Sequence, residues 1–185
     1  MIYVLLADGL EEIEALAPVD FLRRAKVPVT TVAIKSDSVV GSHGIQIKAD
    51  ISLAQADFSD AEMVVLPGGM PGTTNLDELP ELSEILSSVY DRGGYLAAIC
   101  AAPLILGKRG YLKGKEAICY PGYEELLYGA SLSKKGVVRD GRIITAMSAG
   151  FAWQFGAALA EIFIGKEACE RVRLGLFLHL SEKDA

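Results

Sequence analysis

A buried strand that runs directly into a helix is predicted by residues 94–103, which read GYLAAICAAP. Residues 95–99 form a short, unbroken apolar run, as expected for a central strand of a parallel sheet. The residues that follow suit the first turn of a helix, where Pro103 loses no hydrogen bond that the helix needs. The sequence therefore predicts that Cys100 lies at the carboxyl end of a buried strand.

The position of Cys100 predicts a reactive thiol. Free backbone N–H groups and the positive end of a helix dipole would stabilise the thiolate and lower the thiol pKa. The alternative is that Cys100 is a small buried hydrophobic residue, which is the more common role of an arbitrary cysteine. The motifs described below favour the reactive cysteine.

Strands and helices alternate along the rest of the chain. Further strands are predicted at residues 2–7, 29–34, 63–66, 117–120, 136–138 and 142–146, and helices at residues 11–25, 79–91, 123–128, 151–164 and 167–174. This order predicts an α/β fold with a mostly parallel central sheet and helices on both faces. No linker-like change of composition interrupts the 185 residues, so we expect one domain over residues 1–185.

Composition and charge exclude several classes of protein. The chain is 51% hydrophobic and 23% charged, which is ordinary for a soluble globular protein. Its net charge of −6 argues against nucleic acid or an anionic membrane as the main partner. We expect neither a signal peptide nor a membrane span. The three cysteines have no Cys-x-x-Cys spacing, which favours reduced thiols in the cytoplasm.

Three predicted strands end in residues that can form one site. Functional residues of α/β sheets collect beyond the carboxyl ends of the strands. The first strand is followed by GLEEIE at residues 9–14, the strand at 63–66 by PGG at residues 67–69, and the strand at 95–99 by Cys100. If these strands are neighbours, one pocket contains a carboxylate, a glycine loop and a thiol.

Glu14 is the candidate acid–base residue of this site. Burial would raise the pKa of a carboxyl group that points towards a cysteine, and the same group could hydrogen-bond a sulfinate. The alternative is that Glu14, like Glu12, only complements the helix dipole. The N–H groups of Gly69 and Ala101 could form an oxyanion hole, although a tight turn also explains the glycine.

No cofactor and no metal site are predicted. The chain has neither a G-x-G-x-x-G motif nor a P-loop. His43 and His179 lack metal-ligand spacing with another histidine or with a cysteine. We expect His43 in a solvated turn, and His179 at the surface or in a dimer contact.

The chain resembles the ThiJ/PfpI superfamily, in the branch of the parkinsonism-associated protein deglycase and its bacterial relatives. The motifs that carry the resemblance are GLEEIE (9–14), PVD (18–20), VVLPGG (64–69), NL (75–76) and AAICAAP (97–103), with weaker matches at CYPG (119–122), IT (144–145) and GKE (165–167). They cover nearly the whole chain, and their joint order is highly specific.

The resemblance implies a flavodoxin-like three-layer sandwich and a homodimer. It implies that Cys100 is the nucleophile-elbow cysteine, with Glu14 as the acid beside it and with Gly69 and Ala101 at the oxyanion-hole positions. Members of this branch are described as cofactor-free glyoxalases that convert methylglyoxal and water to lactate, as deglycases of early glycation adducts, as oxidative-stress sensors and as chaperones. The implied small-molecule partner is an aldehyde or a glycated substrate.

The chain departs from the branch at three places near the cysteine. Tyr120 stands where many relatives have a histidine, MSAG at residues 147–150 replaces an Arg-Gly-Pro-Gly turn, and His43 replaces an arginine that faces the pocket across the dimer. Fewer cations should raise the Cys100 pKa relative to those relatives. Tyr120 can donate a hydrogen bond but is a poor base near pH 7 at its ordinary pKa. A Cys-His-acid triad of the peptidase or amidotransferase type is therefore not expected.

Three functions remain open, and an enzyme ranks first. In the first, Cys100 adds to the aldehyde of a small 2-oxoaldehyde, Glu14 moves a proton between carbons, and hydrolysis releases a hydroxy acid. In the second, the protein senses oxidative stress through sulfination of Cys100 without fast turnover. In the third, the protein is a binding or chaperone module in which Cys100 has no chemical role.

Overall fold

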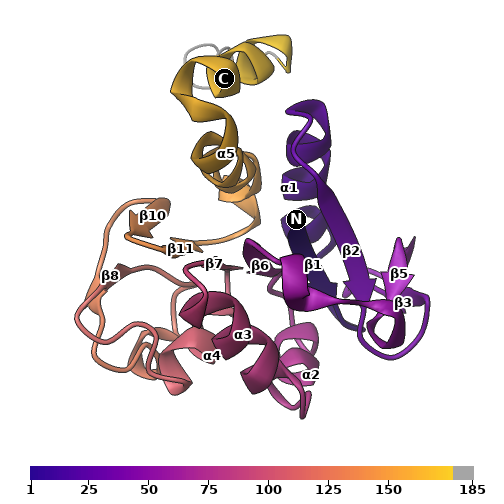
Figure 1. The fold of residues 1–185 in the computed structure, drawn as a ribbon. Helices are drawn as coiled ribbons and strands as arrows, with labels where there is room; N and C mark the ends of the chain where they lie inside the picture. Colours follow the sequence, from indigo (N-terminus) through magenta and orange to yellow (C-terminus); the bar gives the residue numbers. More distant parts are fainter. Residues whose placement is uncertain (177–185) are drawn as a thin grey trace.

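The computed structural model describes residues 1–176 as a central sheet between two layers of helices (Figure 1). The sheet has seven strands in the order β10-β11-β7-β6-β1-β2-β5. These strands are β1 (Ile2–Leu6), β2 (Val29–Ala33), β5 (Ile51–Ser52), β6 (Met63–Leu66), β7 (Tyr95–Ile99), β10 (Val137–Asp140) and β11 (Ile143–Ala146). All pairs are parallel except β10 with β11. The predicted α/β fold is confirmed.

Five helices cover the two faces of the sheet in the described part of the chain. They are α1 (Glu12–Arg24), α2 (Gly72–Asp77), α3 (Leu82–Asp91), α4 (Pro103–Lys108) and α5 (Ala152–Gly175). In Figure 1, α1 and α5 lie above the sheet, and α2, α3 and α4 lie below it. Side chains of β1 alternate between the two cores: Val4 and Leu6 pack with α1 and α5, whereas Tyr3 and Leu5 face the other layer. Burial on both faces explains the unbroken apolar runs of the central strands.

Smaller elements join these layers. Two short strand pairs are β3 (Ser38–Val40) with β4 (Gln46–Lys48), and β8 (Glu116–Ala117) with β9 (Ser131–Leu132). Four single turns of 3₁₀ helix occur at Leu53–Gln55, Phe58–Asp60, Glu124–Leu126 and Ala149–Phe151. α5 is interrupted at Gly165, where φ is 74° and ψ is 166°. The helices predicted at 151–164 and 167–174 are therefore the two parts of α5.

Several local predictions were wrong. The strand predicted at 117–120 ends at Ala117, and the helix predicted at 123–128 is a single 3₁₀ turn. The helix predicted at 79–91 begins only at Leu82, because a residue that precedes proline, here Leu79, disfavours helical torsions. Helix α2 was not predicted, because its six residues carry no helical apolar pattern.

Within residues 1–176, every helix is too short or too polar to cross a bilayer. His179 lies outside the described residues.

Candidate active site

The site is formed where three neighbouring parallel strands end. β1, β6 and β7 lie side by side in the sheet, so the loops that follow them meet at one edge. The closeness is clearest at Gly68: a Cβ atom there would lie 2.5 Å from Glu14 Oε2 and 2.6 Å from Cys100 Cβ. Only glycine fits between the carboxyl group and the cysteine. The sequence analysis predicted one shared pocket on the condition that these three strands are neighbours, and the sheet order meets that condition.

Cys100 occupies a sharp turn between β7 and α4. Its φ is 65°, in the left-handed region that non-glycine residues rarely adopt; this conformation costs about 1–3 kcal/mol and persists only where the surroundings enforce it. The surroundings do so on both sides: the Cys100 N–H donates to the Ala146 carbonyl at 2.9 Å, and the Cys100 carbonyl accepts from the Tyr120 N–H at 2.8 Å. The turn places the thiol at the end of the sheet, where it is partly accessible.

The thiol is less acidic than the sequence suggested. Burial and the Glu14 carboxyl group raise the pKa of Cys100 to about 12, against the opposing effect of the N–H groups of Gly69 and Ala101. Helix α4 begins only at Pro103 and has six residues, so its dipole contributes little at the sulfur. The prediction that this junction lowers the thiol pKa is wrong for the state in which Glu14 is ionised. The two N–H groups nevertheless face the sulfur, at the predicted oxyanion-hole positions.

Glu14 is buried beside the thiol and titrates close to neutral pH. Its side chain is 1% exposed, and burial raises its pKa to about 7, with a further increase from Glu11. The Cys100 side chain and the N–H groups of Gly68 and Ala149 favour the charged form and limit this increase. Oε2 of Glu14 is buried without a hydrogen bond of ordinary geometry. The Glu11 carboxylate accepts the Glu14 N–H at 2.7 Å and so fixes the first turn of α1.

Together, Glu14 and Cys100 form a pair that can exchange one proton. At pH values above about 7, the carboxylate is charged and the thiol keeps its proton. An attack by the sulfur on a carbonyl carbon can therefore deliver the thiol proton to Glu14, which is a base of suitable strength near pH 7. The oxygen anion that develops would face the N–H groups of Gly69 and Ala101.

Tyr120 contacts the site mainly through its backbone. Its N–H holds the Cys100 carbonyl, whereas its side chain is 47% exposed. Within residues 1–176 the Tyr120 hydroxyl makes no hydrogen bond. The sequence analysis considered the Tyr120 hydroxyl group as a hydrogen-bond donor, and the structure of residues 1–176 does not bear this out, because the contact with Cys100 is made by the backbone N–H.

Glu12 has a role that the sequence analysis missed. It is buried, and its Oε1 accepts the His43 N–H at 2.9 Å while its Oε2 lies 2.7 Å from His43 Nδ1. Burial opposes the charge, but the hydrogen bonds from His43 and nearby N–H groups outweigh it and lower the Glu12 pKa to about 2. The interpretation of Glu12 as a simple dipole partner is wrong, because it anchors the turn between β3 and β4.

The same residues form the group of side chains best suited to a metal in the described part of the chain. Ligand atoms of Glu11, Glu12 and His43 lie within 4.8 Å of one another. The Glu12 oxygens already accept hydrogen bonds from the turn, and the Glu11 carboxylate accepts from the Glu14 N–H. These contacts show that the three side chains hold the turn between β3 and β4 and the first turn of α1 in place, which explains why they lie close together.

Gly68 and Ala149 are site residues that the sequence analysis did not single out. Gly68 belongs to the glycine pair at residues 68–69, which was a usable signal for a close approach of the backbone. Ala149 lies in the turn at 147–150, and no local pattern predicts that its N–H faces Glu14.

Comparison with known proteins identifies the family. The model of the DJ-1/PfpI family matches residues 1–162. Protein dj-1beta of Drosophila melanogaster is 38% identical over 178 residues, which covers 95% of each chain. The crystal structure of Drosophila melanogaster DJ-1beta has a TM-score of 0.89 and 39% identity, and the match covers 95% of this chain and 96% of that one. A protein of Caenorhabditis elegans named glutathione-independent glyoxalase DJR-1.2 is 28% identical over 158 residues, covering 85% of this chain and 84% of that protein. Sequence and fold agree that this chain belongs to the DJ-1/PfpI family.

Proposed function

We propose that the protein is a cysteine-dependent glyoxalase that needs no cofactor and converts small 2-oxoaldehydes to hydroxy acids. The observation that carries this proposal is the buried Glu14 carboxyl group, which titrates near pH 7 directly beside the Cys100 thiol. The similarity to a protein named as a glutathione-independent glyoxalase supports it. Early glycation adducts, in which the aldehyde is already joined to an amine or thiol, are the second substrate class for the same groups.

The proposed reaction begins with covalent addition. The Cys100 sulfur attacks the aldehyde carbon, and Glu14 takes the thiol proton and passes it to the new oxygen, which gives a hemithioacetal. The N–H groups of Gly69 and Ala101 stabilise the negative charge that develops on that oxygen. At this stage one C–S bond has formed, and no electron has left the substrate.

Proton transfer and hydrolysis complete the reaction. Glu14 removes the proton from the hemithioacetal carbon and returns one to the neighbouring carbon, so the first carbon is oxidised as the second is reduced. The product is a hydroxyacyl thioester on Cys100. Water then breaks the C–S bond, which releases the hydroxy acid and restores the thiol. The balance requires water alone and no external oxidant or reductant.

The direct test is lactate formation from methylglyoxal by the purified protein in buffer without glutathione. The proposal expects turnover that is lost on heating the protein, and a rate equal to that of the heated sample would contradict it. Because Cys100 must remain a thiol for this chemistry, the proposal places the protein in a reducing compartment, the cytoplasm.

A second candidate function is oxidative-stress sensing at Cys100. The observation that favours it is Glu14 Oε2, a buried oxygen without a hydrogen bond of ordinary geometry beside the thiol. When protonated, Glu14 could donate a short hydrogen bond to an oxygen of a Cys100 sulfinate. In a peroxide titration followed by peptide mass mapping, Cys100 should gain oxygen before the buried Cys119 and Cys169. Earlier oxidation of either buried cysteine would eliminate this candidate.

We also propose that the protein acts as a homodimer. Apolar side chains are exposed along one side of α1 and the neighbouring turn: Ile13 is 53%, Leu16 is 40% and Ile45 is 55% exposed. With Ala17 and Trp153 they border a groove of about 450 Å³. A second copy of the same surface would cover these residues. Light scattering should give the mass of a dimer for the wild type and a monomer for Leu16→Asp, and a monomeric wild type would refute the proposal.

A further inference from the structure

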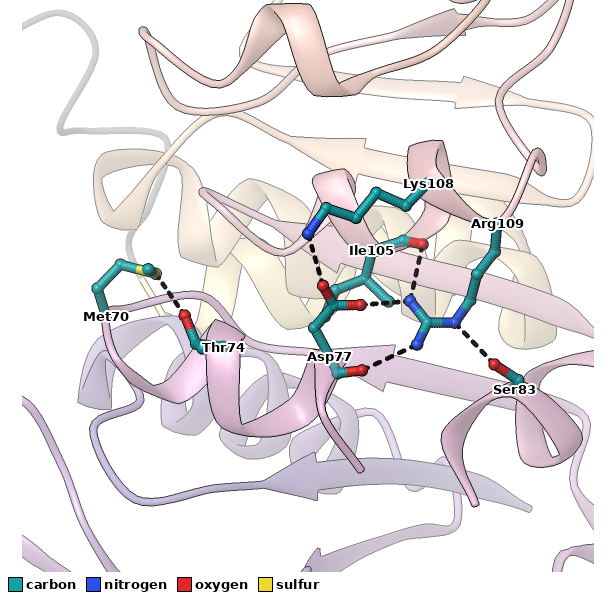
Figure 2. Close-up of polar contacts among 7 residues, drawn as sticks. All are labelled: Met70, Thr74, Asp77, Ser83, Ile105, Lys108 and Arg109. Atoms are coloured by element: carbon teal, nitrogen blue, oxygen red, sulfur yellow. Dashed lines mark hydrogen bonds and ion pairs between the residues drawn. The ribbon is translucent and has the colours of Figure 1, made fainter. Parts of the chain in front are cut away.

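Asp77, the last residue of α2, is held by two consecutive residues at the end of α4 (Figure 2). Lys108 Nζ donates to Asp77 Oδ2 at 2.7 Å, and Arg109 Nη1 donates to Oδ1 at 2.5 Å. Arg109 Nη2 donates to the Asp77 backbone carbonyl at 3.0 Å. The same guanidinium group also reaches Ser83 Oγ at 3.1 Å and the Ile105 carbonyl at 3.3 Å. Arg109 therefore joins α2, α3 and α4.

The contacts of Asp77 with Lys108 and Arg109 form a bridge between α2 and the end of α4. This bridge differs from an ordinary surface ion pair. The side chains of Asp77 and Arg109 are only 17% and 18% exposed. Charges that are mostly withdrawn from solvent are screened less than exposed ones, and an arginine with several fixed acceptors holds a defined geometry. Burial opposes the Asp77 charge, but the hydrogen bonds from Arg109 and Lys108 outweigh it and lower the Asp77 pKa. The bridge is therefore charged at neutral pH.

Each end of the bridge follows one of the two N–H groups that face Cys100 by the same number of residues. Asp77 is eight positions after Gly69, and Arg109 is eight positions after Ala101. A single short helix separates each N–H group from the bridge. Over residues 1–176, every hydrogen bond and ion pair between α2 and α4 involves Asp77. The polar link between the two segments is thus concentrated at one side chain.

Other contacts of the α2 segment lead to a different part of the site. The Gly72 N–H donates to the Gly9 carbonyl at 3.0 Å, and Asn75 Nδ2 donates to the Asp8 carbonyl at 2.7 Å. These bonds tie α2 to the loop after β1. These hydrogen bonds do not connect α2 to α4, so the position of α2 relative to α4 depends on apolar packing and on Asp77.

We propose that Asp77 is a positioning residue that fixes the separation of the Gly69 and Ala101 N–H groups, both of which face the Cys100 sulfur. The inference rests on the proposed role of Cys100 as a nucleophile. Hydrogen-bond donors stabilise developing charge only when they are held within about 0.5 Å of the productive geometry. Loss of the bridge lets α2 and α4 separate, which weakens the stabilisation of negative charge on sulfur and on the substrate oxygen.

The test is the reactivity of Cys100 towards iodoacetamide, a neutral reagent, between about pH 6 and pH 9. Alkylation is followed by mass on the tryptic peptide of residues 93–108, which contains Cys100 as its only cysteine. In Asp77→Ala, we expect the alkylation rate to fall about 10-fold at each pH, because a factor of 10 corresponds to the loss of one well-placed hydrogen bond. Where lactate formation is measurable, kcat should fall while KM stays near the wild-type value.

Asp50→Ala is the matched control. Asp50 also joins separate elements, through Arg23 at 2.6 Å and through the N–H and Oγ1 of Thr31, both at 2.8 Å. This variant should lose comparable stability yet keep the wild-type alkylation profile. A folded Asp77→Ala protein with the wild-type profile would overturn the inference, as would an equal fall in rate in Asp50→Ala.

Asp77→Asn decides the matter if Asp77→Ala does not fold. It keeps an acceptor for Arg109 but loses the charge, so a smaller fall in alkylation rate supports the inference and an unchanged rate overturns it. Because alkylation needs no substrate, these results stand even if the wild type forms no lactate. Absence of lactate would refute the proposed glyoxalase function alone.

Discussion

Cys100→Ser is expected to reduce lactate formation from methylglyoxal to background, a loss of about 10³-fold or more. The hydroxyl group keeps the position of the thiol but is far less acidic and a weaker nucleophile. Glu14, whose pKa is about 7, is too weak a base to ionise it. The measurement is the initial rate of lactate formation at neutral pH, without glutathione, for wild type and variant at equal concentration.

Cys169→Ala provides the control for removal of a thiol. Cys169 is 2% exposed, and its sulfur donates to the Ala157 carbonyl at 3.3 Å, in the core between α1 and α5. This variant should be less stable but should retain the wild-type rate per folded molecule. A Cys100→Ser protein that keeps the wild-type rate would show that the thiol is not the nucleophile.

Glu14→Gln is expected to lower kcat by about 10²–10⁴-fold, the usual contribution of a positioned general acid–base. In the wild type, kcat/KM should rise with pH through about 7, as Glu14 becomes able to accept the thiol proton. The residual activity of the variant should lack this rise. Glu84→Gln, at an exposed position on α3, should leave both the rate and the pH profile unchanged.

Glu14→Gln should also make the Cys100 thiol more reactive, although it lowers turnover. The Glu14 carboxyl group is one of the causes that raise the Cys100 pKa to about 12, and glutamine removes its charge. Alkylation of Cys100 by iodoacetamide near pH 8 should therefore become faster in Glu14→Gln. Slower alkylation together with unchanged lactate formation would contradict the coupling of the two groups.

Stability should respond to pH through Glu14 as well. Its pKa is raised from 4.5 to about 7 in the folded protein, so its contribution to stability is fully present below about pH 4.5 and is lost as the pH rises through 7. The loss amounts to about 3 kcal/mol. The measurement is urea denaturation of both proteins. The free energy of unfolding of Glu14→Gln minus that of the wild type should increase by about 3 kcal/mol as the pH rises from about 4.5 to above 7.

The central strands could be predicted from the sequence because their signal is local. β6 and β7 have the predicted bounds, since a strand buried on both faces requires an unbroken apolar run. The ends of these strands pointed to Cys100 and to the glycine loop. Their adjacency to β1 was an inference from the fold class, which the sheet order confirms.

The electrostatics of the site could not be predicted in the same way. The sequence suggested an acidic Cys100 thiol from its place at a helix start, but the sign of the pKa shift depends on burial and on Glu14, which lies 86 positions away. The role of Glu12 was missed because His43 reaches it only in the folded chain. Asp77 and Arg109 are 32 positions apart, and no periodic pattern in the sequence indicates that they form a bridge.

The central claim is that Cys100 forms a covalent hydroxyacyl intermediate during turnover. The most direct measurement is acid quenching of the protein during reaction with methylglyoxal, followed by mass analysis of the tryptic peptide of residues 93–108, which contains no arginine that the aldehyde could modify. The account predicts that this peptide gains the mass of one methylglyoxal molecule on Cys100, and that hydroxylamine releases the group as a hydroxamate, as it does from a thioester. An unmodified Cys100 peptide, while lactate accumulates, would contradict it.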